Sequence, residues 1–84
     1  PRGEMSMYSK IIQVEDTGER SKGQEFSSPV YNATLRLTLD TGEVINLTAS
    51  SPLKRELPKA IARYSRAWAE KLGDTWHITT SPLL

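Results

Sequence analysis

The stretch that decides the fold runs from Val30 to Ser50 and reads VYNATLRLTLDTGEVINLTAS. Apolar and polar side chains alternate along its first half, which is the period of a strand with one buried face. Asp40, Thr41 and Gly42 then interrupt the alternation. A three-residue loop that ends in glycine suits a type I turn followed by a G1 bulge. The pattern therefore predicts a β-hairpin.

The turn also predicts which residues of the two strands face each other. If Leu39 lies opposite Glu43, one face of the hairpin is apolar and the other is almost entirely polar. The expected apolar pairs are Leu37–Ile45, Leu35–Leu47 and Ala33–Ala49, and the expected pairs on the other face are Thr38–Val44, Arg36–Asn46 and Thr34–Thr48. A slip by one residue would mix the faces. Because the turn and the hydrophobic pattern agree, we expect one buried and one open face.

The segment before this hairpin combines a strand and an irregular stretch. Residues 8–15 (YSKIIQVE) predict an earlier strand, with Ile12 and Val14 on its inner face. Residues 16–29 (DTGERSKGQEFSSP) have no period and contain serine, glycine and proline. We expect a flexible loop there, which is either a mobile connector or a binding loop anchored by Phe26.

Residues 75–80 (TWHITT) predict a short last strand, with Trp76 and Ile78 on its buried side and His77 facing solvent. The chain has one histidine and no cysteine, so a metal site would have to be built mainly from carboxylates. We expect neither a metal ion nor a cofactor.

Residues 51–72 predict a helix, because apolar side chains recur at every third or fourth position. This stripe consists of Leu53, Leu57, Ala60, Ile61, Tyr64, Trp68 and Leu72. Ser51 suits the N-cap and Gly73 the C-terminal cap. Pro58 conflicts with a continuous helix, since an interior proline removes a hydrogen bond and clashes with the preceding turn, at about 3 kcal/mol. We therefore expect a kink beside this proline.

The formal net charge of +1 conceals a polarised chain. Residues 51–72 carry six basic and two acidic side chains, a net charge of +4, which leaves −3 for the rest of the chain. On a helix, Arg55, Lys59, Arg63 and Arg66 would share the side away from the apolar stripe. This basic helix face is either a solvated surface, a dock for an acidic protein or a contact for nucleic-acid phosphates.

Sequence motifs of catalysis are weak. Asp-Thr-Gly, at 16–18 and 40–42, resembles the triplet that carries the catalytic carboxylate of retroviral-type aspartic proteases. The resemblance covers three residues, glutamate follows both copies where that family has a small residue, and aspartate and glycine are common in turns. We find no nucleophile–histidine–acid pattern and no glycine-rich phosphate loop. We expect no catalytic residues, and an enzyme that works through Asp16 and Asp40 is the weakest alternative.

These segments predict an α+β domain with the order β-β-β-α-β, in which an antiparallel sheet of three to four strands carries one proline-kinked helix on one face. Residues 1–7 are expected to be a disordered N-terminal segment or a remnant of cloning, and residues 8–84 one small domain. No apolar run approaches the ~18–20 residues of a membrane span. We therefore expect no membrane contact and a cytoplasmic location.

The expected function is that of a small, non-enzymatic interaction or regulatory module, monomeric or homodimeric. It would bind a protein partner through the polar sheet face or the basic helix face. The expected contact residues are Arg36, Asn46, Arg55, Lys59, Arg63 and Arg66. The alternative is a nucleic-acid-binding protein whose basic helix face contacts phosphates. Base stacking on the sheet is not expected, because the polar sheet face has no aromatic side chain.

Overall fold

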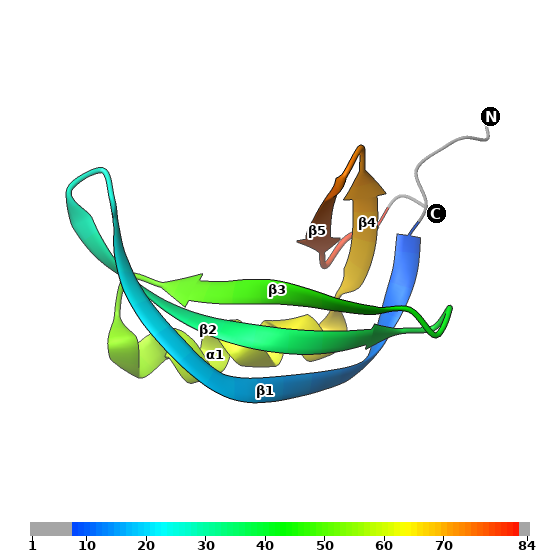
Figure 1. Cartoon of the computed structure of the whole chain (residues 1–84), viewed down its shortest axis with the longest axis horizontal. Coiled ribbons are helices and arrows are strands. Elements are labelled where there is room, and N and C mark those ends of the chain that lie inside the picture. Colours follow the sequence, from blue (N-terminus) through cyan, green and yellow to red (C-terminus); the bar gives the residue numbers. More distant parts are fainter. Residues whose placement is uncertain (1–7, 83–84) are drawn as a thin grey trace.

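Five strands form one antiparallel sheet in the order β3-β2-β1-β4-β5 (Figure 1). The computed structural model describes residues 8–82, so the prediction for residues 1–7 lies outside the described part. The strands are β1 (Tyr8–Glu25), β2 (Ser28–Leu39), β3 (Val44–Ser51), β4 (Trp68–Leu72) and β5 (Thr75–Thr79). The α+β class is confirmed. The sheet has five strands rather than three to four, because a further strand precedes the last one.

One short helical segment connects β3 to β4. It consists of the 3-10 turn η1 (Lys54–Glu56), the helix α1 (Leu57–Arg63) and the 3-10 turn η2 (Tyr64–Arg66). We call it helical segment 54–66. No helix in the part of the chain that the structure describes is long and apolar enough to cross a membrane.

The hairpin of β2 and β3 has the predicted register. The observed pairs are Ala33–Ala49, Thr34–Thr48, Leu35–Leu47, Arg36–Asn46, Leu37–Ile45 and Thr38–Val44. Gly42 has a φ of 92°, and the Leu39 N–H donates to the Glu43 carbonyl at 2.9 Å, as the predicted turn requires. The apolar face is buried, and Leu35 and Leu37 are fully so.

The loop predicted for residues 16–29 is wrong. Residues up to Glu25 continue β1, β2 begins at Ser28, and the two strands pair to their ends. Every residue from Glu15 to Pro29 is exposed. Since none of residues 15–29 is buried, this stretch needed no apolar alternation, and the usual strand signal was absent from it.

β1 curves strongly and belongs to both halves of the sheet (Figure 1). Residues Tyr8 to Lys10 pair with β4, and the rest of the strand pairs with β2. A bulge marks the transition, because Ile11 pairs with Leu39 and Gln13 with Thr38.

This bulge decides which residues of β1 reach the core. Ile11 is 3% exposed, Val14 packs against the core cluster, and Ile12 is 63% exposed. The prediction that Val14 faces inward is confirmed. The prediction for Ile12 is wrong, because the extra residue shifts the alternation at this point.

The predicted helix begins later than expected. Ser51 ends β3, and its hydroxyl contacts the backbone of Leu53 instead of capping a helix. The predicted break at Pro58 takes the form of a change from a 3-10 turn to an α-helix. Pro58 lies in the first turn of α1, where its missing N–H removes no helical hydrogen bond.

The helix also ends earlier than expected. Residues 68–72 form β4, which pairs with both β1 and β5, and Gly73 lies in the following turn with a φ of 63°. These residues keep a helical period in the sequence. Two ladders with neighbouring strands outweigh that local preference, which is a weak one.

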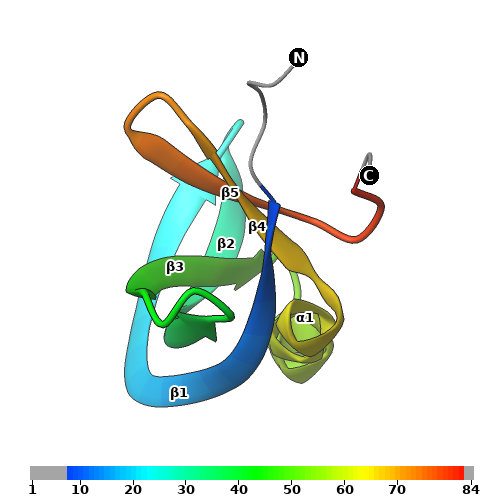
Figure 2. The same cartoon turned by 90° about the vertical axis from the view of Figure 1, so that its right-hand side faces the viewer.

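The core lies between the inner sheet face and helical segment 54–66, which Figure 2 shows on one side of the sheet. Its buried members are Ile11, Leu35, Leu37, Leu39, Ile45, Ala49, Tyr64, Ala67 and Ala69. Trp76 and Ile78 pack against this cluster, as predicted. The Tyr64 hydroxyl donates to the Thr48 carbonyl at 2.9 Å and so joins the helical segment to β3.

Candidate functional site

The face of β1, β2 and β3 that points away from α1 carries the side chains that alternate with the buried ones. Figure 1 looks onto this surface, with α1 behind it, and Figure 2 shows α1 on the opposite side. We call it the outer sheet face. It consists of Ile12, Gln13, Glu15, Thr34, Arg36, Thr38, Val44, Asn46 and Thr48. The two β2 threonines are half-buried, and the other members are exposed.

The structure brings the predicted contact residues Arg36 and Asn46 together as cross-strand partners. Glu15 is the partner of Arg36 on the other side. The Arg36 Nη1 lies 3.0 Å from the Glu15 Oε1, and both side chains are about half exposed. Such an ion pair contributes little to stability in water. The pair does cancel the two charges, so the cross-strand row of Glu15, Arg36 and Asn46 is close to neutral.

Two aliphatic side chains also lie on the outer sheet face. The bulge leaves Ile12 beside Gln13, which faces Thr38, and Thr38 faces Val44 on its other side. Ile12 is 63% exposed and Val44 is 52% exposed. The polar surface therefore includes an apolar part at one end.

Ile12 is the surface residue that the sequence analysis missed. The available signal was the pair Ile11-Ile12, which breaks the alternation of residues 8–15. Two neighbouring large apolar residues in a strand leave one of them on the solvent side, because successive side chains point to opposite faces of the sheet. The pair could not show which residue would be buried, because that depends on the bulge.

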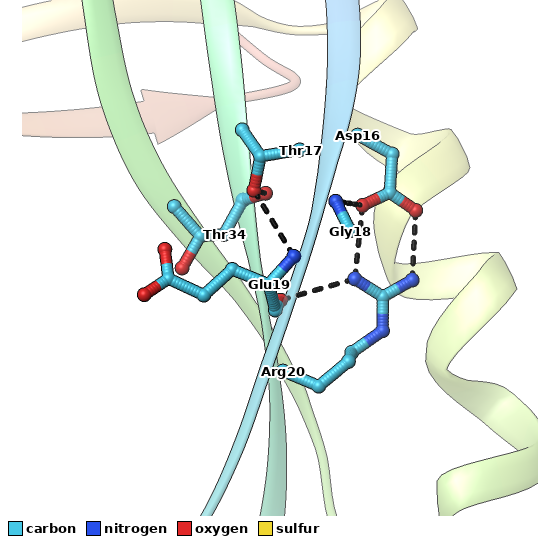
Figure 3. Close-up of polar contacts among 6 residues, drawn as sticks. All are labelled: Asp16, Thr17, Gly18, Glu19, Arg20 and Thr34. Carbon is cyan, nitrogen blue, oxygen red and sulfur yellow. Dashed lines mark hydrogen bonds and ion pairs between the residues drawn. The ribbon is translucent and has the colours of Figure 1, made fainter.

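A second irregularity of β1 holds a network of charged and backbone groups (Figure 3). The Arg20 guanidinium donates to both carboxylate oxygens of Asp16, at 2.9 and 2.7 Å, and the Gly18 N–H donates to the same carboxylate at 2.9 Å. The bonds from Arg20 and then from Gly18 lower the pKa of Asp16 to about 2. This carboxylate is therefore ionised at neutral pH, and it already accepts three hydrogen bonds from Arg20 and Gly18.

Both copies of the sequence Asp-Thr-Gly-Glu hold the glycine at a positive φ and share one hydrogen bond. Gly18 and Gly42 have φ values of 86° and 92°, and in each copy the glutamate N–H donates to the threonine Oγ1, at 3.2 and 3.3 Å. The two aspartates lie apart, since Asp16 pairs beside Leu35 whereas Asp40 follows the end of β2. Five residues along the strand, from the level of Leu35 to Asp40, span roughly 17 Å, so the aspartates form no carboxylate pair.

The tip of the β1–β2 hairpin presents an exposed aromatic ring. Phe26 and Ser27 have φ values of 52° and 67°, the conformation of a type I′ turn, and Phe26 is 95% exposed. A hollow of about 350 Å³, open to solvent, lies beside it. Its lining residues are Glu25, Phe26, Ser28, Pro29, Val30, Ser50, Ser51 and Pro52. The idea of a binding site anchored by Phe26 stays a prediction, now for a hairpin tip instead of a loop.

The other four predicted contact residues lie on helical segment 54–66. Arg55, Lys59, Arg63 and Arg66 are all exposed. The helical segment packs against the inner sheet face, so these four residues and the pair Arg36–Asn46 lie on opposite sides of the sheet. The six predicted residues therefore form two separate surfaces rather than one site.

The remaining chemistry and the comparisons with known proteins add no assignment. Within residues 8–82, no three or more histidine, aspartate and glutamate side chains are grouped so that they could hold a metal ion. His77 is exposed, as predicted, and pairs across the strands with Glu70. No protein-family model, no curated protein and no solved structure matches this chain.

Proposed function

We propose that this chain is a cytoplasmic, non-enzymatic interaction module that binds a protein partner through the outer sheet face. The observation that supports this most is the position of Ile12, which the bulge turns toward solvent beside Thr38. Nothing in the core requires an aliphatic side chain at this position. A partner that covers Ile12 and Val44 would remove apolar surface from water, at about 25 cal/mol per Å².

The composition of the outer sheet face fits a protein partner. Protein interfaces combine an apolar centre with arginine and with polar side chains that can form hydrogen bonds. The outer sheet face supplies Ile12 and Val44 as the apolar part, Arg36 as the arginine, and threonine and asparagine as the polar part. It has no aromatic side chain for base stacking, and its one arginine is paired with Glu15. Both features disfavour a nucleic acid on this surface.

The strand order supports the location of the site. Five strands in the order β3-β2-β1-β4-β5, with a helix between β3 and β4, resemble the connectivity of the OB-fold. That fold is a partly open barrel, and the face of its second and third strands binds oligonucleotides and oligosaccharides. Arg36 and Asn46 lie on the corresponding face of this chain. Because one fold hosts many functions, the resemblance supports the place of the site and not the class of partner.

The test is affinity capture from a lysate of the source organism, compared between the wild type and the double variant Ile12→Ser, Val44→Thr. We expect the wild type to retain a partner that the double variant loses, and nuclease treatment to leave the wild-type result unchanged. Leu72→Ser is the matched control, since Leu72 is also 52% exposed but lies at the end of β4.

Thermal melting of each variant shows whether it is folded. Retention of the same proteins by the wild type and the double variant would contradict the proposal. Loss of the partner after nuclease treatment would also contradict it, because the partner would then be held through nucleic acid.

A further inference from the structure

We infer that helical segment 54–66 carries a second binding site, which takes the phosphate backbone of a nucleic acid. Its cations are Lys54, Arg55, Lys59, Arg63 and Arg66, and all five are exposed. With Glu56 as the one acidic residue, the segment has a net charge of +4. The inference does not depend on the proposed protein partner, because that partner would lie on the opposite side of the sheet.

The fold itself does not need these five charges. Leu57 and Tyr64 are the buried residues of the segment, and Ala60 and Ile61 pack partly against the core. Among residues 8–82, one ion pair involves these cations, between the Lys59 Nζ and the Glu56 Oε1 at 3.6 Å. Its side chains are 84% and 40% exposed, so the pair is weak.

Two of the cations also stand where a helix disfavours them. Lys54 and Arg55 lie in η1, near the positive end of the α1 dipole and separated from α1 by Glu56, whereas Arg63 and Arg66 are favourably placed at its other end. Five like charges on one short segment also repel one another. A bound polyanion would relieve both effects, which gives these side chains a role that packing does not supply.

Phosphate fits this surface better than an acidic protein does. Arginine accounts for three of the five cations, and its planar group binds phosphate through two hydrogen bonds. Tyr64, the one aromatic side chain of the segment, is buried and donates to the Thr48 carbonyl. The segment therefore offers cations and no exposed ring, so its contacts with a nucleic acid would be with phosphates rather than with bases.

The dimensions of the segment match those of a nucleic-acid strand. Seven α-helical residues at about 1.5 Å and six 3-10 residues at about 2.0 Å span roughly 22 Å. One strand of B-DNA places a phosphate about every 3.4 Å along the axis, so roughly six phosphates lie within that span. With no exposed aromatic ring in the segment, contacts with phosphates would not distinguish one base sequence from another.

The test is fluorescence anisotropy with a labelled DNA duplex of about 20 base pairs, titrated between about 50 and 200 mM NaCl. With five phosphate contacts, the wild-type affinity should fall roughly 500-fold over this range. For the double variant Arg63→Gln, Arg66→Gln, the fall should be only roughly 40-fold, because two contacts are lost. Lys22→Gln removes an exposed cation from β1, outside helical segment 54–66, and should leave the wild-type slope unchanged.

A second double variant, Lys54→Gln, Arg55→Gln, guards against a folding defect at the end of the helix and should flatten the slope equally. Absence of binding at about 50 mM NaCl, or equal slopes for the wild type and both double variants, would overturn the inference. So would equal affinity for poly-glutamate of similar charge, since the surface would then recognise acidic chains in general.

Discussion

At the scale of single residues, the bulge in β1 separates two identical neighbours. Ile11 is 3% exposed and belongs to the core cluster, whereas Ile12 is 63% exposed on the outer sheet face. Both have the same side chain and the same strand preference, so the sequence around them cannot distinguish their positions. The register of β1 against β2 makes that distinction.

This difference predicts opposite results for the same substitution. Ile11→Ala should lower the free energy of unfolding by about 2–5 kcal/mol, because it leaves a cavity in the core. Ile12→Ala should change it by no more than about 0.5 kcal/mol, as for most surface positions. Urea denaturation measures both. Equal losses for the two variants would show that Ile12 is buried and would contradict the bulge.

Asp16 and Arg20 give a second prediction at the residue scale. The folded-state pKa of Asp16, about 2, lies below its ordinary value of 3.8. The network therefore stabilises the fold above pH 3.8, and this contribution is lost as the pH falls toward 2. Arg20→Gln should raise the pKa of Asp16, because it removes the largest cause of the shift. Carboxyl NMR titration measures this, and an unchanged pKa would contradict the network in Figure 3.

At the scale of elements, turn chemistry places the β2–β3 hairpin. Gly42 has a φ of 92°, where side chains other than glycine are strained, although a Cβ there would meet no neighbouring atom within 4 Å. Gly23 lies in β1 without a positive φ, and a Cβ there would meet only the Asn32 Nδ2, at 3.8 Å. Gly42 is therefore required for its backbone conformation, whereas Gly23 is not.

Alanine at each glycine tests this distinction. Gly42→Ala should destabilise the fold by about 1–2 kcal/mol, since it forces alanine into the left-handed region. Gly23→Ala should leave stability unchanged or raise it by up to about 1 kcal/mol, because it restricts the unfolded chain. Thermal melting of both variants measures the two effects. A loss at Gly23 as large as that at Gly42 would show that φ is not the cause.

At the scale of the whole molecule, the sheet separates two surfaces of different chemistry. The outer sheet face is close to neutral with an apolar part, and helical segment 54–66 has a net charge of +4. Because the outer sheet face and helical segment 54–66 lie on opposite sides of the sheet, a single contact surface of one ligand cannot cover both. The two proposed sites therefore do not compete for the same surface, and a chain that binds at both would link a protein to a nucleic acid.

Independence of the two surfaces is itself testable. Arg63→Gln with Arg66→Gln should weaken DNA binding in anisotropy and leave protein capture unchanged. Ile12→Ser with Val44→Thr should do the reverse. If either double variant reduced both activities while its melting temperature stayed normal, the two ligands would share a surface, and the division by the sheet would be wrong.

The sequence by itself determined the β2–β3 hairpin, its register and its buried face, because turn type and alternation are local properties that reinforce each other. It also identified the exposed cations and the break at Pro58. Only the tertiary structure decided the rest. Residues 68–72 have a helical period but form β4, because β1, about 60 residues earlier, offers them a strand to pair with. The bulge that exposes Ile12 and the separation of the predicted contact residues likewise follow from pairing between distant segments, which no local pattern records.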